Sequence, residues 1–462
     1  MGCVMRRYRR AWGRGALMGA MALASPLAQG MSFLTAYQLA RQNDPTFAAA
    51  RAAYDAAREQ IPRSRAHLLP HLALTGSDDK TRAETAFQDP IYGPSQVDRS
   101  VGAWTWSLQL SQPLVAIPQI FRYEQSQALV VKATALYRRA QQHLIVRVAQ
   151  AYFRVLVAVR TVRAARAQVR AMTAQWRLAR HGFAKGIDAV TDVDETQAQL
   201  ARAQAQLVGA QNTETNACAQ LQQMIGGRLT PGLEALSPGL MLPKPAPEDR
   251  AAWVQRARSK APVVRAAKAA LKAARKHVDG AFARYAPRVD LVASYGQNAS
   301  SGSLTTPDNY SLRARSWEAG VQVSVPIFTG GGTYAYATQA QAYARQAAAE
   351  LREASRHAQL QALEAYEGVM AGRTQVVALT LAVRSGRKAV RGAHKGYKVG
   401  IRTNLDVLTV ERDLYESERA LASLQYRTLL DGLRLKASVG RLTIADVLTI
   451  NKMLIEPVPL HE

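Results

Sequence analysis

The longest stretches of this chain carry small and apolar residues at helical spacing. Pro118 to Gly182 has no proline or glycine between its ends, and Gly332 to Gly396 covers a similar span of 65 residues. In both, alanine, leucine and valine recur at intervals of three and four. A helix of this length would extend about 100 Å. The pattern therefore favours close coiled-coil packing of long helices over one globular core.

Two other regions alternate between apolar and polar residues, as strands do. A strand is expected to begin at Pro70 and a second to cover Val101 to Leu110, with a polar, turn-rich loop between them. One face of the second strand carries Trp104, Trp106, Leu108 and Leu110, and the other carries Ala103, Thr105, Ser107 and Gln109. A later strand pair alternates in the same way, with one face formed by Val289, Leu291, Ala293, Tyr295, Trp317, Ala319, Val321 and Val323.

Such alternation fits either the half-buried sheet of a soluble protein or the wall of a membrane barrel. Segments of about 10 residues with tryptophan near their ends favour the barrel, apolar toward lipid and polar toward a lumen. Four strands cannot close a barrel, and an open sheet in lipid would leave its edges unpaired. Closure therefore requires several chains. Three chains would give twelve strands and two would give eight, and the pattern does not choose between them.

The whole pattern occurs twice. Matching landmarks recur at offsets of 213 to 217 residues, and they include Pro70 and Pro287, Leu108–Leu114 and Val321–Ile327, and Tyr152 and Tyr366. Each unit is predicted to contain a helix, two strands, a long helix, a turn and a shorter helix. In the first unit the shorter helices, Phe33–Ala66 and Val190–Gly226, total 71 residues and would match the long helix if stacked end to end. A hollow helical bundle below a barrel is the expected outcome.

A short motif joins the long helix of each unit to the helix that follows. It reads Phe183-Ala-Lys-Gly-Ile-Asp-Ala-Val-Thr-Asp-Val193 in the first unit and Tyr397-Lys-Val-Gly-Ile-Arg-Thr-Asn-Leu-Asp-Val407 in the second. Gly186 and Gly400 occupy the same place and are predicted to give the backbone the freedom that a sharp turn needs. These turns would form the far ends of two long hairpins, where we expect the functional residues.

The first 30 residues are interpreted as a signal peptide. Five arginines precede the short apolar run from Ala16 to Leu23, and small residues that suit cleavage follow it. Without this segment one cysteine, Cys218, remains, so no disulfide can form within the chain, and we expect Cys218 to serve in packing. No later segment is apolar enough for a transmembrane helix.

The chain is strongly basic, with a formal net charge of +26. Nucleic-acid binding is the obvious interpretation of such a charge. It is disfavoured here because arginine is spread along helical faces, because no nucleic-acid-binding motif occurs, and because an exported protein rarely meets DNA. Removing the arginine-rich leader still leaves +21.

Together these motifs resemble the TolC family of outer-membrane efflux proteins, and the resemblance covers essentially the whole mature chain. It rests on the duplicated Asn43-Asp-Pro45-type start, the strand end Val325-Pro-Ile-Phe-Thr-Gly-Gly-Gly332, and the turn Gly396–Arg402 followed by Asp406-Val-Leu408. The resemblance implies a homotrimer with one twelve-stranded barrel across the outer membrane and an α-helical tunnel through the periplasm. It also implies an exit duct for type I protein secretion or small-molecule efflux.

The resemblance also assigns roles to residues of the two turns. Tyr397 and Arg402 match residues that hold the periplasmic end shut, and Thr191 and Asp192 match their partners on the neighbouring turn. The chemistry is sound by itself, because arginine donates several directed hydrogen bonds to a carboxylate and tyrosine can add one. Each exposed pair is worth at most about 1 kcal/mol, so such a latch could be undone by a partner protein.

Asp406 matches one of two acidic rings that line the tunnel mouth in the family. The second ring position is Thr409 here, so we expect weaker cation selectivity. An alternative role for Asp406 is a helix N-terminal carboxylate stabilised by the helix dipole. A glutamate that often supports the latch in the family is His394 in this chain, so the resemblance does not supply that extra bond here.

Basic residues crowd toward the second turn. They are a solvated helix face or a docking surface for the acidic or polar tip of a periplasmic adaptor, and the candidate docking residues are Arg387, Lys388, Arg391 and Lys395. Other chemistry is disfavoured: no Gly-Lys-Ser/Thr follows the glycines at 330–332, and Pro70 separates His67 from His71. We expect no catalysis, no cofactor and no metal.

The fold class expected is mainly α with a membrane β-barrel: long antiparallel helical hairpins form a tunnel, and each chain contributes four strands. The domains expected are a signal peptide (1–30), two structural repeats (31–240 and 241–440) and a C-terminal segment (441–462) that packs outside the tunnel. The function expected is a passive outer-membrane duct that contacts lipid, an adaptor and an ABC or RND inner-membrane pump, with type I secretion slightly favoured. The competing class is a periplasmic coiled-coil structural or adaptor protein.

Overall fold

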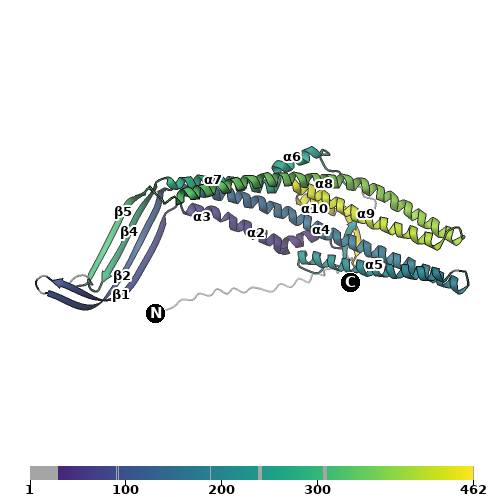
Figure 1. Cartoon of the computed structure of the whole chain (residues 1–462), viewed down its shortest axis with the longest axis horizontal. Coiled ribbons are helices and arrows are strands. Elements are labelled where there is room, and N and C mark those ends of the chain that lie inside the picture. The colour runs from purple at the N-terminus through teal and green to yellow at the C-terminus, as the bar shows by residue number, and fades with distance from the viewer. Residues whose placement is uncertain are drawn as a thin grey trace, which may run out of the picture.

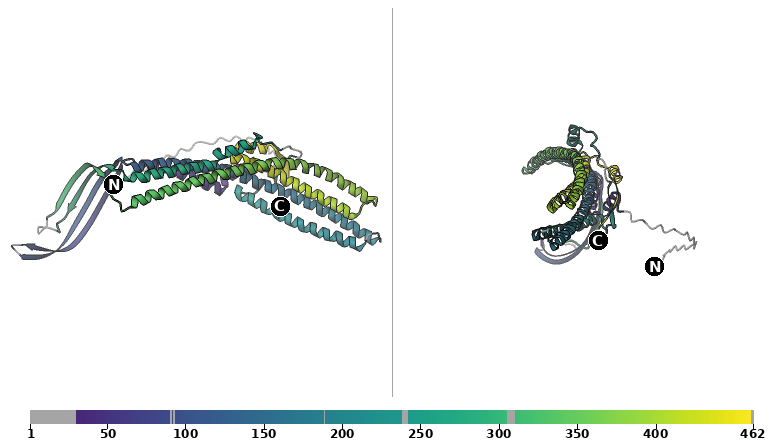
Figure 2. Two further views of the ribbon diagram at one scale, coloured as in Figure 1. Left: turned by 45° about the horizontal axis from the view of Figure 1, so that its top comes forward. Right: turned by 90° about the vertical axis from the view of Figure 1, so that its right-hand side faces the viewer.

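A computed structural model of the chain describes residues 30–89, 91, 93–187, 189–237, 242–304 and 310–460. The molecule is very elongated, with a β-sheet at one end and two helical hairpin tips at the other (Figure 1). Viewed along the long axis, the helices follow an arc (Figure 2). The predicted signal peptide lies outside the described residues except for Gly30.

Four long helices form the shaft, as predicted. They are α4 (Ile117–Ala184), α5 (Val190–Ile225), α8 (Gly332–Lys398) and α9 (Asn404–Ser438). α4 packs against α5 and α8 packs against α9, which gives the two antiparallel hairpins. Alanine is the most frequent buried residue of α4, α5 and α8, so the axes of these helices can approach their neighbours closely.

The predicted single helix over Phe33–Ala66 was wrong: the segment forms α1 (Phe33–Asn43), α2 (Pro45–Arg58) and α3 (Gln60–Ala66). α2 starts anew because the Asp44 carboxylate accepts a hydrogen bond from the Phe47 N–H at 2.7 Å, which caps the helix ahead of Pro45. The second unit breaks in the same place, into α6 (Arg250–Lys260) and α7 (Pro262–Phe282), followed by the short 3-10 helix η1 (Ala283–Tyr285).

The strands are β1 (His71–Asp89), β2 (Gly93–Val115), β4 (Arg288–Ser300) and β5 (Leu312–Ser324), in the order β1-β2-β4-β5 with all pairs antiparallel. The polar loop expected before Val101 was largely wrong. Pairing runs without interruption from His71↔Ser111 to Asp89↔Gly93, so the loop is the distal part of a long hairpin. Backbone hydrogen bonds extend such a ribbon whatever the polarity of its side chains.

The strand register joins the predicted apolar positions into one face. Leu74 lies opposite Leu108, Leu108 opposite Tyr295, and Tyr295 opposite Trp317. Trp317 is 78% exposed, so this face lacks a protein partner within the described chain. The other face is polar, and the hydroxyls of Thr75 and Ser107 lie 2.9 Å apart there. None of the helices in the described ranges is long and apolar enough to cross a membrane.

A small second sheet lies halfway along the shaft. It pairs β3 (Gly232–Leu236) with β6 (Leu454–Pro459), and α10 (Ile444–Asn451) precedes β6. The end marked C lies on the convex side of the helical arc (Figure 2). Cys218 packs against the adjoining core, and burial raises the pKa of its thiol to about 11. A thiol with this pKa is inert near neutral pH, which agrees with a packing role.

Candidate functional site

The two hairpin tips have the same backbone geometry. In the first, Gly186 has φ of +71°, and the Ile187 N–H donates to the Gly182 carbonyl at 2.9 Å. In the second, Gly400 has φ of +74°, and the equivalent bond, from residue 401 to residue 396, is also 2.9 Å long. This is the helix-terminating pattern that a left-handed residue allows. Figure 1 shows both tips at the same end of the molecule.

The Gly400→Ala variant should destabilise its hairpin tip by about 1 kcal/mol, because alanine is strained at positive φ. A Cβ at Gly400 would have open space around it, so the cost would come from the backbone alone. Gly392→Ala is the matched control: it also adds a methyl group in open space, but within α8, where alanine is favoured over glycine. Hydrogen exchange of the tip amides measures both variants, and equal protection in the two would contradict the prediction.

Arg402 lies across the end of α8. A Cβ built on Gly396 would stand 3.1 Å from Arg402 Cγ, so glycine at this position allows the arginine to cross closely. The Arg402 N–H also donates to the Gly396 carbonyl at 3.3 Å. Tyr397, one residue on, is half-buried, whereas Arg402 is exposed. The turn thus presents an arginine at the tip of the molecule.

Asp406 forms a capping box with Thr403 at the start of α9. Its carboxylate accepts hydrogen bonds from the Thr403 N–H at 3.0 Å and from the Thr403 hydroxyl at 2.9 Å. These bonds, and then the nearby Arg402 guanidinium, hold the pKa of Asp406 below its usual value. The carboxylate is therefore charged at neutral pH and serves its own helix terminus. The acidic ring at the tunnel mouth stays a prediction.

The first tip carries Thr191 and Asp192, both exposed, in the first turn of α5. The Asp192 carboxylate accepts a bond of 3.3 Å from the Ala189 N–H. The recorded contacts of Asp192 and of Arg402 stay within their own turns, so a single chain does not join the two tips through these residues. A latch formed between neighbouring chains stays a prediction.

His394 contacts a carboxylate that the sequence did not single out. Its Nε2 lies 2.8 Å from Oε1 of Glu411, which joins the last turns of α8 to the second turn of α9. The Glu411 side chain is 7% exposed and the His394 side chain 42%. His394 precedes Gly400 by six residues and Glu411 follows it by eleven, a spacing that could place them face to face in a hairpin.

The predicted docking residues differ in their ion pairs and in their position relative to a groove on the shaft. Arg387 binds Glu418 of α9 through Nε at 3.0 Å and Nη2 at 2.7 Å, so its charge is balanced. Lys388 and Arg391, together with Arg387, line a groove of about 760 Å³. Lys395 lies beyond this groove, in the last turn of α8. The groove is strongly basic because Arg160, Arg373 and Arg384 also line it, whereas Glu456 is the one carboxylate that lines it among the described residues.

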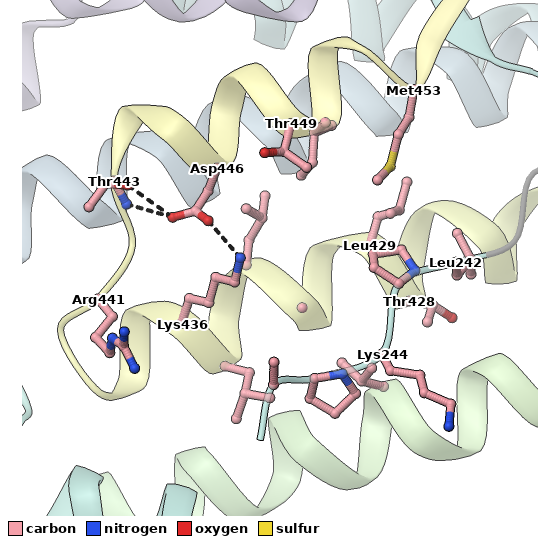
Figure 3. A pocket seen from close by; sticks show the side chains of 18 of the residues that line it. Leu242, Lys244, Thr428, Leu429, Lys436, Arg441, Thr443, Asp446, Thr449 and Met453 are labelled. Atoms are coloured by element: carbon pink, nitrogen blue, oxygen red, sulfur yellow. Dashed lines mark hydrogen bonds and ion pairs between the residues drawn. The ribbon is translucent and has the colours of Figure 1, made fainter. Parts of the chain in front are cut away.

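A second cavity, of about 600 Å³, lies between α9, α10 and residues 242–246 (Figure 3). Two of its charged side chains bind each other: Lys436 Nζ lies 2.6 Å from an Asp446 oxygen, and Asp446 also accepts from the Thr443 N–H at 2.8 Å. No sequence pattern indicated this cavity. Within the described part of the chain, no group of three His, Cys, Asp or Glu residues could hold a metal ion.

Comparison with known proteins shows the same architecture elsewhere. The family model described as "Outer membrane efflux protein" matches residues 36–227 and 253–441. The alkaline protease secretion protein AprF of Pseudomonas aeruginosa is 31% identical over 90% of this chain and 86% of its own length. The outer membrane protein TolC of Escherichia coli is 30% identical over 94% of this chain and 87% of its own length.

Solved structures agree on the fold. The Campylobacter jejuni CmeC outer membrane channel superposes with a TM-score of 0.74 over 94% of both chains at 17% identity. The outer membrane protein VceC of Vibrio cholerae gives 0.71 over 88% of this chain and 96% of its own, at 20% identity. The predicted resemblance and the outer-membrane location, with the helices in the periplasm, are confirmed. The chain belongs to the outer membrane efflux protein family, whose members include TolC.

Proposed function

We propose that this protein is a trimeric exit duct of a tripartite export system, which passively conducts cargo across the periplasm and the outer membrane. The observation that carries the proposal is the four-stranded sheet with one exposed apolar face. This sheet is continuous with the helical shaft, whose longest helix, α4, has 68 residues. An apolar face of this kind suits lipid, and the opposite polar face suits a water-filled lumen.

The sheet supports assembly from several chains. β1 and β5 are its outer strands, and each has one neighbour within the described chain. Open edges are not tolerated in lipid, so β5 of one chain would pair with β1 of the next. Three chains would then give a barrel of twelve strands. In this assembly the two repeats (31–240 and 241–440) occupy equivalent places, and residues 441–462 pack outside the tunnel.

The periplasmic end of the duct would be closed by the hairpin tips. Arg402 and Tyr397 of one turn would bind Thr191 and Asp192 of a neighbouring turn, and three copies of Asp406 would line the mouth. The support is the exposure of Arg402 and Asp192 at tips that share one end of the molecule. His394 would act inside its own hairpin through Glu411 rather than in the latch.

We infer that the partners are a periplasmic adaptor and an inner-membrane pump, which supplies the energy for transport. Protein secretion is the favoured use. AprF and the proteases secretion protein PrtF of Dickeya chrysanthemi, at 31% and 29% identity, are named for it. The probable efflux pump outer membrane protein TtgC of Pseudomonas putida is less similar, at 23% identity. An ABC-type pump would fit protein secretion, and an RND-type pump would fit small-molecule efflux.

Single-channel recording tests the duct. The purified protein should give small, cation-preferring conductance steps in a planar bilayer and cross-link to a trimer in detergent. A folded, oligomeric protein that forms no channels would contradict the duct and favour the alternative, a periplasmic coiled-coil structural or adaptor protein.

Charge reversal in the basic groove should weaken export. The Lys388→Glu, Arg391→Glu variant should lose most export of a co-expressed cargo while its trimers remain intact, because an acidic adaptor tip would be repelled and a polar one would lose its hydrogen-bond donors. The matched control is Arg345→Glu with Arg352→Glu, which reverses two exposed arginines of α8 far from the tip. Secreted cargo is measured per unit of assembled protein. Unchanged export in the groove variant would contradict docking at this surface.

A further inference from the structure

A basic pocket lies where the sheet joins the helical shaft. It has a volume of about 550 Å³ and is formed by the start of α4, the end of α7, η1, and the ends of β4 and β5 nearest the shaft. The basic side chains that line it are Arg122, Lys276, His277, Arg284 and Arg288. No aspartate or glutamate of the described chain lines it.

Two of these cations lack a balancing carboxylate. Lys276 binds Glu124 at 2.8 Å and Asp279 at 3.4 Å, and Arg288 binds Asp290 at 2.7 Å. The ion pairs of the described residues include neither Arg122 nor Arg284. Like charges that converge in this way repel one another, and a bound anion would relieve that repulsion.

The geometry of Arg284 suits anion binding. Its Cζ lies 3.8 Å from the ring centroid of Tyr336 on α8, so the guanidinium is held against the aromatic ring. A guanidinium on an aromatic ring can keep its edge N–H groups available for a bidentate oxyanion. The ring of His277 lies 5.4 Å from the same tyrosine. Burial, and then the charges of Arg284 and Arg122, lowers the pKa of His277.

The strand register places the pocket on the polar side of the sheet. Arg288 and Ser324 lie opposite each other, one residue out of phase with the apolar pair Val289 and Val323. They therefore share the face of Ser294 and Glu318 rather than that of Tyr295 and Trp317. If the polar face lines the lumen, as in the proposed function, the pocket opens into the duct at the junction of barrel and tunnel.

We propose that this pocket binds oxyanions, the phosphate or carboxylate groups of solutes in the duct, through Arg122 and Arg284. Access from the lumen rests on the proposed function, whereas the binding itself needs only the pocket. In a trimer, three such pockets would ring the junction and attract anionic cargo, at the opposite end of the shaft from Asp406.

The test uses the full-length protein and two probes, inorganic pyrophosphate and a short glutamate-rich peptide. Titration calorimetry in detergent measures binding, and planar-bilayer recording measures block of the conductance. The variant is Arg122→Gln with Arg284→Gln. The matched control, Lys272→Gln with Arg275→Gln, removes the same charge from α7 outside the pocket. We expect the variant to weaken binding by about tenfold or more and to lose block, while the control retains both.

The possible outcomes distinguish failure of the oxyanion pocket from failure of the proposed duct. Binding that survives in the variant, or is equally lost in the control, would contradict the pocket. Binding without block would contradict its place in the duct wall. Pyrophosphate binding in a protein that forms no channels would contradict the proposed function but support the oxyanion site. Binding of pyrophosphate but not of the peptide would assign the site to small phosphate-bearing solutes rather than to carboxylates of a polypeptide.

Discussion

The Arg402→Ser variant should form channels of much larger conductance than the wild type. Arg402 is the exposed cation of the second hairpin tip, and the proposed latch joins it to Asp192 of a neighbouring chain. An exposed ion pair is worth at most about 1 kcal/mol. Because a trimer would hold three equivalent pairs, their loss would destabilise the closed state by up to about 3 kcal/mol. The ratio of open to closed duct would then rise by up to about a hundredfold.

Single-channel recording of purified protein measures this shift, as conductance per channel and as the fraction of time spent open. Lys398→Ser is the matched control, because it removes another exposed cation, four residues before Arg402, from the same hairpin tip. Asp192→Ser should reproduce the opening if the pairing is correct. Channels whose conductance is the same in Arg402→Ser and the wild type would agree with the proposed duct and contradict the latch.

The Tyr152→Phe variant should loosen the middle of the shaft. Tyr152 is fully buried, and its hydroxyl lies 2.7 Å from the Met31 carbonyl and 2.9 Å from the Glu234 carbonyl, while it accepts the Glu234 N–H at 3.0 Å. One side chain thus holds α4 to β3 and to the start of the described chain. Removal of the hydroxyl would deprive the Glu234 carbonyl of this donor and leave the Glu234 N–H and the Met31 carbonyl with only their mutual bond of 3.3 Å, at a cost of about 2 kcal/mol.

Hydrogen exchange gives a local measurement of this effect in the assembled protein. Amides of β3 should exchange about thirtyfold faster or more in the variant, which corresponds to the expected cost. Tyr366 is the equivalent residue of the second repeat, and its hydroxyl makes a single bond of 2.6 Å, to the Glu248 carbonyl. Tyr366→Phe is therefore the control: it should have a smaller effect, near residue 248. Unchanged exchange of β3 in Tyr152→Phe would contradict the prediction.

Much of the architecture could be predicted because it depends on local periodicity. The span from Pro118 to Gly182 lacks residues that break helices between its ends, and α4 covers all of it. The parity of Leu108, Tyr295 and Trp317 predicted one apolar face, and the register places them side by side. Gly186 and Gly400 were expected at sharp turns, and both have positive φ.

Errors arose where local signals compete. The asparagine–aspartate–proline sequence at residues 43–45 was taken as a helix start within one long helix, but the Asp44 cap ends one helix as it begins the next. The charged residues before Val101 indicated a loop, but pairing with β1 carries β2 through them. Side-chain polarity predicts which surroundings a residue prefers, and not whether its backbone is paired.

The sequence by itself determined the duplicated plan, the long hairpins, the two-faced strands and the positions of the glycine turns, because each follows from a repeat of two or 3.6 residues or from one backbone requirement. The tertiary structure alone decided which side chains meet. It joined His394 to Glu411, Arg387 to Glu418 and β3 to β6, and it gathered Arg122 and Arg284 into one pocket. These contacts depend on the rotation and register of elements far apart in the chain, which hydrophobic periodicity does not specify.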